Sequence, residues 1–154
     1  MQETKTISFV VYGRPQQRGS KQSMVRYAGG SPVMRNGRVA TFTMDANKKS
    51  GSWMAEVRSM AAAAHSGELL AGPVTMECRF YFSRPKSHYG AKGVKQSAPE
   101  QHTQTPDVDK LLRAVADALT GVVWRDDRQA WAVVGRKFWT EFADRLEVEI
   151  RATN

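Results

Sequence analysis

The sequence predicts one α/β domain of the α+β type, in which helices pack on a mixed sheet. Three observations support this fold class. The 154 residues are enough for about one domain with a sizeable core. The content of 41% hydrophobic and 25% charged residues is typical of a folded chain. Apolar patterns typical of strands and helices follow one another in the order β-α-β-α-β-β, without an internal repeat. We therefore treat residues 1–154 as a single domain.

The first half of the chain supplies three of these elements. Residues 4–11 alternate apolar and polar side chains and predict a strand. Residues 13–41 are rich in Gly, Arg, Gln and Ser without a period, and predict a long loop that can include a short hairpin. Residues 45–65 carry apolar side chains three and four positions apart, which predicts a helix. Residues 74–82 give the clearest strand, and its inward row includes Cys78, which we expect to pack in the core.

The second half begins with a long polar segment, residues 83–105, of the kind that is functional or disordered in a compact domain. Residues 106–119 then carry an apolar stripe at helical spacing, and Gly121 can end that helix. Residues 130–140 and 144–151 alternate as two further strands.

The beginning of the sequence, MQETKTISFV, lacks the basic and apolar regions of a signal peptide, and no apolar run reaches transmembrane length. We therefore expect a cytoplasmic protein with no membrane partner. Cys78 is the only cysteine, which excludes an intrachain disulfide and a zinc site built from cysteines.

Positive charge gathers in two segments. Residues 1–49 hold nine Lys or Arg against two acidic residues, a local balance of +7, and residues 83–99 hold four Lys or Arg and no acid. Because Lys and Arg bind phosphates by releasing counterions, these segments suggest nucleic acid as a partner. A basic surface that aids solubility explains the charge about equally well. The candidate DNA-binding residues are Arg14, Arg18, Lys21, Arg26, Lys92, Lys95 and Lys110.

Negative charge gathers in one stretch, PDVDKLLRAVADALTGVVWRDDRQ, which holds five of the seven aspartates. In a structural interpretation the first aspartate caps the helix, the second and third pair with Arg113 along one helix face, and the DD pair begins a turn. In a functional interpretation the DD turn lies beside the helix start, where three or four carboxylates repel each other unless a cation joins them. From the spacing alone, the structural and the functional interpretation are about equally well supported. The five are Asp107, Asp109, Asp117, Asp126 and Asp127.

The functional interpretation favours Mg²⁺, for which Mn²⁺ can substitute, because carboxylate oxygens suit these hard ions and no His or Cys lies in the cluster. A basic protein that holds such an ion beside bound nucleic acid can polarise a phosphate, activate a water and stabilise the leaving oxygen. This chemistry is typical of a nuclease.

The same stretch resembles the signature of the RusA family of Holliday junction resolvases: a PD-x-D pair, a helix ending in D-A-L, and a D-D-x-Q turn before a strand. The element order is similar over nearly the whole chain. The resemblance implies a homodimeric, magnesium-dependent endonuclease that resolves four-way DNA junctions by paired symmetric nicks in recombination and repair, and that is often encoded by phages or prophages. By position it makes Asp107, Asp109 and Asp127 the essential acidic residues and metal ligands, with Asp126 beside them.

Two positions depart from the family pattern. Lys110 stands where the family often has Asn, and Arg113 stands where it has a functional Lys. Arg cannot release a proton at working pH, so we expect Arg113 to contribute to catalysis by stabilising charge on the cleaved phosphate.

Two rival functions stay open at this point. One is a magnesium-dependent nuclease for flaps, single strands or other branched nucleic acid, and the other is a DNA-binding protein without catalysis, in which the aspartates only cap and pair. Trp124, Trp131 and Trp139 could stack on bases, but their places at strand edges favour core packing.

Overall fold

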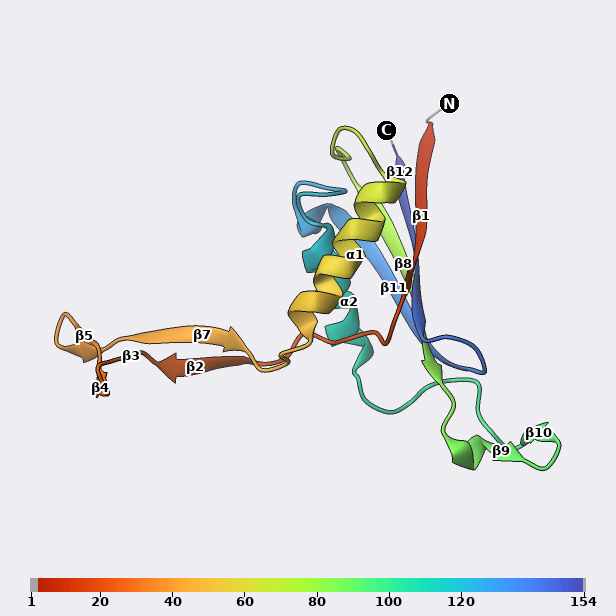
Figure 1. Cartoon of the computed structure of the whole chain (residues 1–154). Helices are drawn as coiled ribbons and strands as arrows, with labels where there is room; N and C mark the ends of the chain where they lie inside the picture. Colours follow the sequence, from red (N-terminus) through yellow and green to blue (C-terminus); the bar gives the residue numbers. More distant parts are fainter. Residues whose placement is uncertain (1–2, 154) are drawn as a thin grey trace.

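A four-stranded mixed sheet is the centre of the protein, whose computed structural model describes residues 3–153 (Figure 1). The strand order is β1-β12-β8-β11. β12 is antiparallel to both of its neighbours, whereas β8 and β11 are parallel. The strands are β1 (Thr4–Tyr12), β8 (Val74–Ser83), β11 (Ala130–Thr140) and β12 (Arg145–Thr153). The predicted mixed sheet of an α+β domain is therefore confirmed.

Two helices, α1 (Ser50–Ala64) and α2 (Val108–Leu119), cover one face of this sheet (Figure 1). Every second residue of β8 from Val74 to Phe82 is buried against them, as the alternation predicts. Cys78 lies in this row, where burial raises the pKa of its thiol, so the thiol stays protonated and packs as an apolar group. Within the described residues, no helix is long and apolar enough to cross a membrane.

α2 packs on β11 unusually closely, because the strand has a glycine at the point of contact. A Cβ on Gly135 would lie 2.7 Å from Leu112 Cδ1 and 2.9 Å from Val108 Cγ2. The helix therefore lies against the bare backbone of the strand. At its other end α2 stops at Thr120, and Gly121 follows with φ of 82°, a conformation that glycine adopts without strain.

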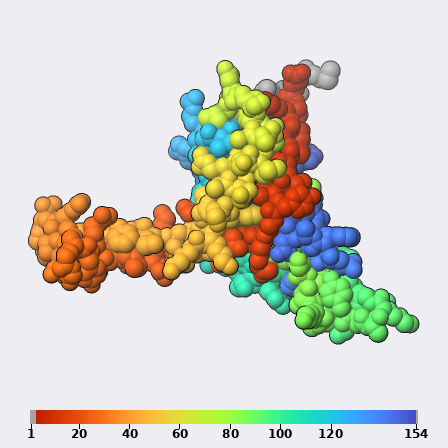
Figure 2. Space-filling model, viewed as in Figure 1, coloured from red at the N-terminus to blue at the C-terminus, as the bar shows by residue number. Residues whose placement is uncertain are grey.

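Residues 20–46 form a β-ribbon that stands clear of the domain (Figures 1 and 2). Its stem is an antiparallel pair, and two small hairpins form its tip. Gly29–Gly30 and Asn36–Gly37 have positive φ and turn the two hairpins. The strands are β2 (Lys21–Val25), β3 (Tyr27–Ala28), β4 (Ser31–Pro32), β5 (Met34–Arg35), β6 (Arg38–Val39) and β7 (Thr41–Asp45).

The β-ribbon corrects two sequence predictions. Residues 13–41 are not a loop with a short hairpin, because most of them belong to paired strands. The helix predicted from residue 45 begins at Ser50, because Asp45 ends β7. Gly51 lies in the first turn of α1 and is exposed, so glycine is tolerated there.

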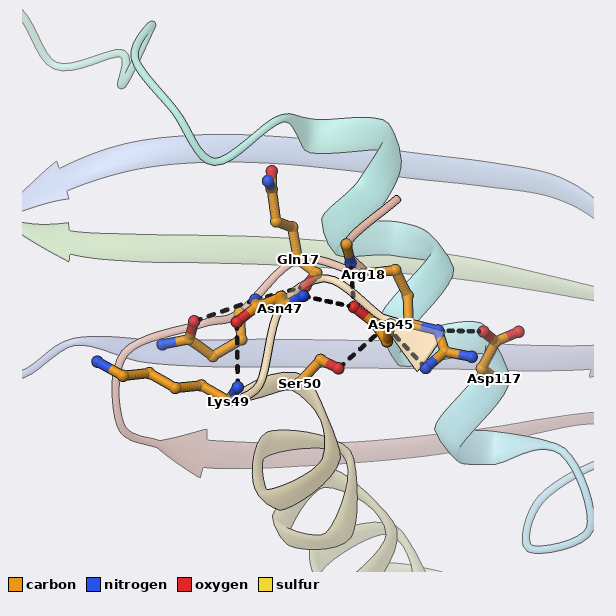
Figure 3. Close-up of polar contacts among 9 residues, drawn as sticks. Gln17, Arg18, Asp45, Asn47, Lys49, Ser50 and Asp117 are labelled. Carbon is orange, nitrogen blue, oxygen red and sulfur yellow. Dashed lines mark hydrogen bonds and ion pairs between the residues drawn. The ribbon is translucent and has the colours of Figure 1, made fainter. Parts of the chain in front are cut away.

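Asp45 holds the base of the β-ribbon together (Figure 3). One carboxylate oxygen accepts the backbone N–H groups of Gly19 and Asn47, both at 2.8 Å. The other accepts the Ser50 hydroxyl at 3.1 Å and Arg18 Nη1 at 3.0 Å. Burial raises the pKa of Asp45, but these donors lower it by more, so that the pKa lies below its usual range and the side chain stays charged.

Arg18 connects the base of the β-ribbon to α2. Its Nε donates to Asp117 Oδ2 at 3.0 Å while its Nη1 donates to Asp45 (Figure 3). Its backbone N–H donates to the carbonyl of Lys110 at 3.2 Å. These bonds fix the direction in which the β-ribbon leaves the domain.

A second, smaller projection is formed by the segment that connects β8 to α2 along the chain. It contains a short 3₁₀ helix, Lys86–His88, and a hairpin of β9 (Tyr89–Gly90) and β10 (Gly93–Val94). Its returning chain is tied to β11 by backbone bonds, from Trp139 N to Glu100 O at 2.8 Å and from His102 N to Lys137 O at 3.0 Å.

Because α2 lies so close to Gly135, adding a single methyl group at this position should destabilise the fold. Gly135→Ala should lower the free energy of unfolding by about 1–3 kcal/mol, because Leu112 and Val108 must move away to admit it. Gly51→Ala is the matched control: nothing lies within 4 Å of its added Cβ, and alanine should stabilise α1 by about 0.5–1 kcal/mol. Thermal melts of the two variants should therefore shift in opposite directions, and equal shifts would show that α2 is not seated on Gly135.

Candidate active site

Asp107 and Asp109 lie exposed at the beginning of α2. Asp107 occupies the predicted N-cap position, with φ of −76° and ψ of 135°, but its side chain makes no capping hydrogen bond. Its backbone N–H instead donates to Gln17 Oε1 at 2.8 Å, and its carboxylate lies 3.5 Å from Lys110 Nζ. Both carboxylates are thus open to a ligand from outside the chain.

Lys137 supports this end of α2, and sequence reasoning missed it. Its Nζ donates to Gln104 O at 2.6 Å and to Pro106 O at 2.7 Å, the backbone that leads into Asp107. Burial lowers the pKa of Lys137, although the Asp107 carboxylate acts in the opposite direction. A lysine on the inward row of a predicted strand, two residues after Gly135, is the signal that could have found it.

Asp126 and Asp127 lie at the other end of α2, in the turn before β11. Asp126 accepts the backbone N–H of Arg128 at 2.9 Å and its guanidinium at 2.8 Å, and these bonds lower the pKa of Asp126 to about 2. Gln129 joins the turn to the domain through Nε2, which donates to Leu70 O at 2.9 Å. The structural interpretation of Asp126 is therefore confirmed, while Asp127 is exposed.

The two pairs of aspartates do not meet within one chain. α2 runs antiparallel to β11, since Val108 lies over Gly135 and the Asp126–Asp127 turn directly precedes Ala130. The 12 residues of the helix span about 18 Å at about 1.5 Å per residue. Accordingly, within residues 3–153 no three His, Cys, Asp or Glu side chains are grouped to hold a metal ion. The convergence considered from the sequence does not occur in one protomer.

Arg113 does not pair with its helical neighbours. Asp117 is bound by Arg18, and Arg113 has no ion-pair partner among the residues that the structure describes. The ion pairs of the structural interpretation, from Arg113 to Asp109 and Asp117, therefore do not form among the described residues. Arg113 instead lines a cavity of about 560 Å³ at the base of the β-ribbon, which Lys21 also lines.

The other candidate DNA-binding residues divide between the two projections. Lys21 and Arg26 lie on the β-ribbon, Lys92 and Lys95 lie on the smaller one, and all four are exposed. Arg14 is exposed near the end of β8, with its guanidinium 5.4 Å from the centre of the Phe82 ring. Figure 1 shows both projections leaving the end of the domain where α2 begins. Arg18 differs from the rest, because Asp45 and Asp117 already bind its guanidinium.

One tryptophan contradicts the expected core packing. Trp124 is buried and Trp139 is half-buried, but Trp131 is 71% exposed. It lies at a bulge in β11, an edge strand whose free side is covered by the returning chain only from Lys137 onward. Val133 and Val134 are also exposed, so the open half of this edge is apolar.

Comparison with known proteins identifies the family of the chain. The family model described as endodeoxyribonuclease RusA matches residues 28–151. A relative from Bacillus subtilis (strain 168), described as the uncharacterized protein YqaN, is 32% identical over 149 residues, which cover 94% of this chain and 95% of the relative. The match takes in α2, both pairs of aspartates, the smaller projection and most of the β-ribbon. The chain therefore belongs to the RusA family of endodeoxyribonucleases.

Proposed function

We propose that this protein is a magnesium-dependent endonuclease that resolves four-way DNA junctions by paired symmetric nicks, acting as a homodimer in the cytoplasm during recombination or repair. One observation carries the proposal: the exposed carboxylates of Asp107 and Asp109 lie at the end of the domain from which both basic projections leave. Bound DNA would thus reach carboxylates that a cation must neutralise. Membership of the RusA family supports the substrate class.

The donor chemistry of this end fits Mg²⁺, which is usually held by one or two carboxylates together with waters and substrate phosphates. Asp107 and Asp109 supply the oxygens, and Lys137 holds the backbone that carries them. Asp127 lies in the turn beyond the other end of α2, too far away to join them in the same chain. We therefore assign the third carboxylate to a second protomer.

The free edge of β11 supports such a dimer. Its open half, residues 130–136, exposes Trp131 and Val133 beside unpaired backbone groups, and such edges pair with other strands. A two-fold axis at this edge makes the contact self-complementary and the pairing antiparallel. The Asp126–Asp127 turn precedes β11, so that pairing would carry it toward the beginning of α2 in the other copy. Two such sites match the two-fold symmetry of a four-way junction.

A DNA-binding protein without catalysis is the rival function, and the separation of the aspartates in one chain favours it. Incubation of labelled four-way junction, flap and duplex DNA with and without Mg²⁺ distinguishes the two. Resolvase activity predicts paired nicks in the junction with Mg²⁺ only. Binding that survives EDTA without cleavage under Mg²⁺ or Mn²⁺ would establish the rival, and equal cleavage of all three substrates would indicate a general nuclease.

Replacing single carboxylates gives a sharper test. Asp107→Asn, Asp109→Asn and Asp127→Asn should each abolish magnesium-dependent cleavage, because the amide keeps the shape but removes the charge that holds the ion. Junction binding should persist in all three. Glu141→Gln, in the exposed turn between β11 and β12, removes the same charge elsewhere and should cleave normally. If any of the three Asp→Asn variants cleaves at the wild-type rate, the aspartate replaced in it is not a metal ligand.

Arg113 should act on the chemical step rather than on stability. Because it has no ion-pair partner among the described residues, Arg113→Ala should leave the thermal melt almost unchanged. It should slow single-turnover cleavage at saturating Mg²⁺ by about two to three orders of magnitude, the usual scale for losing one fixed electrostatic donor. Arg113→Lys should recover much of the rate. Arg58→Ala, on the exposed side of α1, is the control, and an unchanged rate for Arg113→Ala would refute the assignment.

A further inference from the structure

The β-ribbon exposes more apolar surface than a connection between two elements requires. Tyr27 and Met34 at its tip are 63% and 58% exposed. On the stem, the register places Met24 opposite Phe42, with Met44 on the same face. Figure 2 shows that the ribbon stands clear of the rest of the molecule. Apolar side chains displayed on a long projecting segment mark a binding surface.

The positive charge of the β-ribbon indicates that its binding partner is a polyanion. Between residues 21 and 44 it carries four cations and no acidic side chain. None of the four has an ion-pair partner among the described residues, since Asp45 at the base is bound by Arg18. Two such ribbons would repel each other, and a polyanion would attract them. The four are Lys21, Arg26, Arg35 and Arg38.

The shape of the β-ribbon suits a DNA duplex. Its stem continues past β2 and β7 through a bond from Arg26 N to Ala40 O at 2.9 Å, which makes six paired positions on each strand. At about 3.4 Å per residue the stem is about 20 Å long. A two-stranded ribbon of this kind enters the major groove, which is about 12 Å wide. The exposed apolar side chains would then meet thymine methyl groups and sugars.

We propose that the β-ribbon binds a duplex segment of the substrate at a distance from the cleaved phosphate, with Arg35 and Arg38 at its tip contacting backbone phosphates. The inference rests on the proposed function, because it takes DNA as the substrate. Lys21 and Arg113 line one cavity at the base of the ribbon, so cations run from the tip toward α2. The ion pairs of Arg18 hold the ribbon at a fixed angle, and the bound duplex is thereby oriented relative to Asp107.

The test compares two double variants of equal charge. Arg35→Gln/Arg38→Gln removes two cations at the tip, and Lys5→Gln/Arg58→Gln removes two exposed cations from β1 and α1. Fluorescence anisotropy measures binding of a labelled plain duplex and a labelled junction in EDTA over a range of salt concentrations. The tip variant should bind both DNAs about ten- to a hundredfold more weakly at 0.1 M salt. Its negative slope of log Kobs against log salt should become less steep by about 1.8, since each phosphate contact contributes about −0.9 to the slope. The control should keep the wild-type slope.

An unchanged slope for the tip variant, with or without a loss of affinity, would overturn the proposal, because no phosphate contact would have been lost. So would a change in the monomer–dimer equilibrium with unchanged DNA binding, which would make the ribbon a dimer contact. Thermal melts should match wild type, because both side chains at the tip are exposed. The binding measurement in EDTA is independent of cleavage, so the two proposals can fail separately. A wild-type protein that binds the junction but never cleaves it in Mg²⁺ contradicts the proposed function alone. If the wild-type protein cleaves the junction in Mg²⁺ but the tip variant has the wild-type salt slope, only the ribbon's role is contradicted.

Discussion

The seating of α2 on the bare backbone of Gly135 determines where the acidic side chains of this protein lie. With Leu112 and Val108 pressed against the glycine, the helix lies along β11 in the antiparallel direction. Asp107 and Asp109 consequently stand at one end of the helix and the Asp126–Asp127 turn at the other. A motif that is continuous in sequence is thus divided across the domain, and this division makes a second protomer necessary for a site with three carboxylates.

The Arg18 ion pairs explain why acidic residues occur at the base of a basic projection. Asp45 and Asp117 come from β7 and α2, and Arg18 neutralises both while it connects the two elements. Because these side chains are partly buried and Asp45 also accepts two backbone N–H groups, the connection is stronger than an exposed ion pair. The cost is that Arg18 is no longer available to phosphate. In the proposed mode of binding, the positive charge for DNA then comes from residues farther along the β-ribbon.

The sequence predicts those parts of the fold in which burial sets a period. β8, β12 and α2 each follow a regular apolar row, and their predicted bounds agree with the structure within about two residues. The β-ribbon escaped prediction because neither of its faces is buried in the domain, so no alternation marks its strands. Arg18 and Asp117 are 99 positions apart in the sequence, so no local sequence pattern could predict their ion pair. Trp131 was expected in the core because of its place at the edge of a predicted strand, whereas a bulge at the sheet edge exposes it.

We propose that each active site takes Asp107 from one protomer and Asp127 from the other. Co-expression of Asp107→Asn and Asp127→Asn chains tests it directly, because a mixed dimer then has one site with both substitutions and one with neither. Nicking of a labelled junction in Mg²⁺ should return to about a quarter of the wild-type level for random pairing, although each variant alone is inactive. If the mixed preparation is as inactive as the separate variants, Asp107 and Asp127 act within the same chain and the account of a shared site is contradicted.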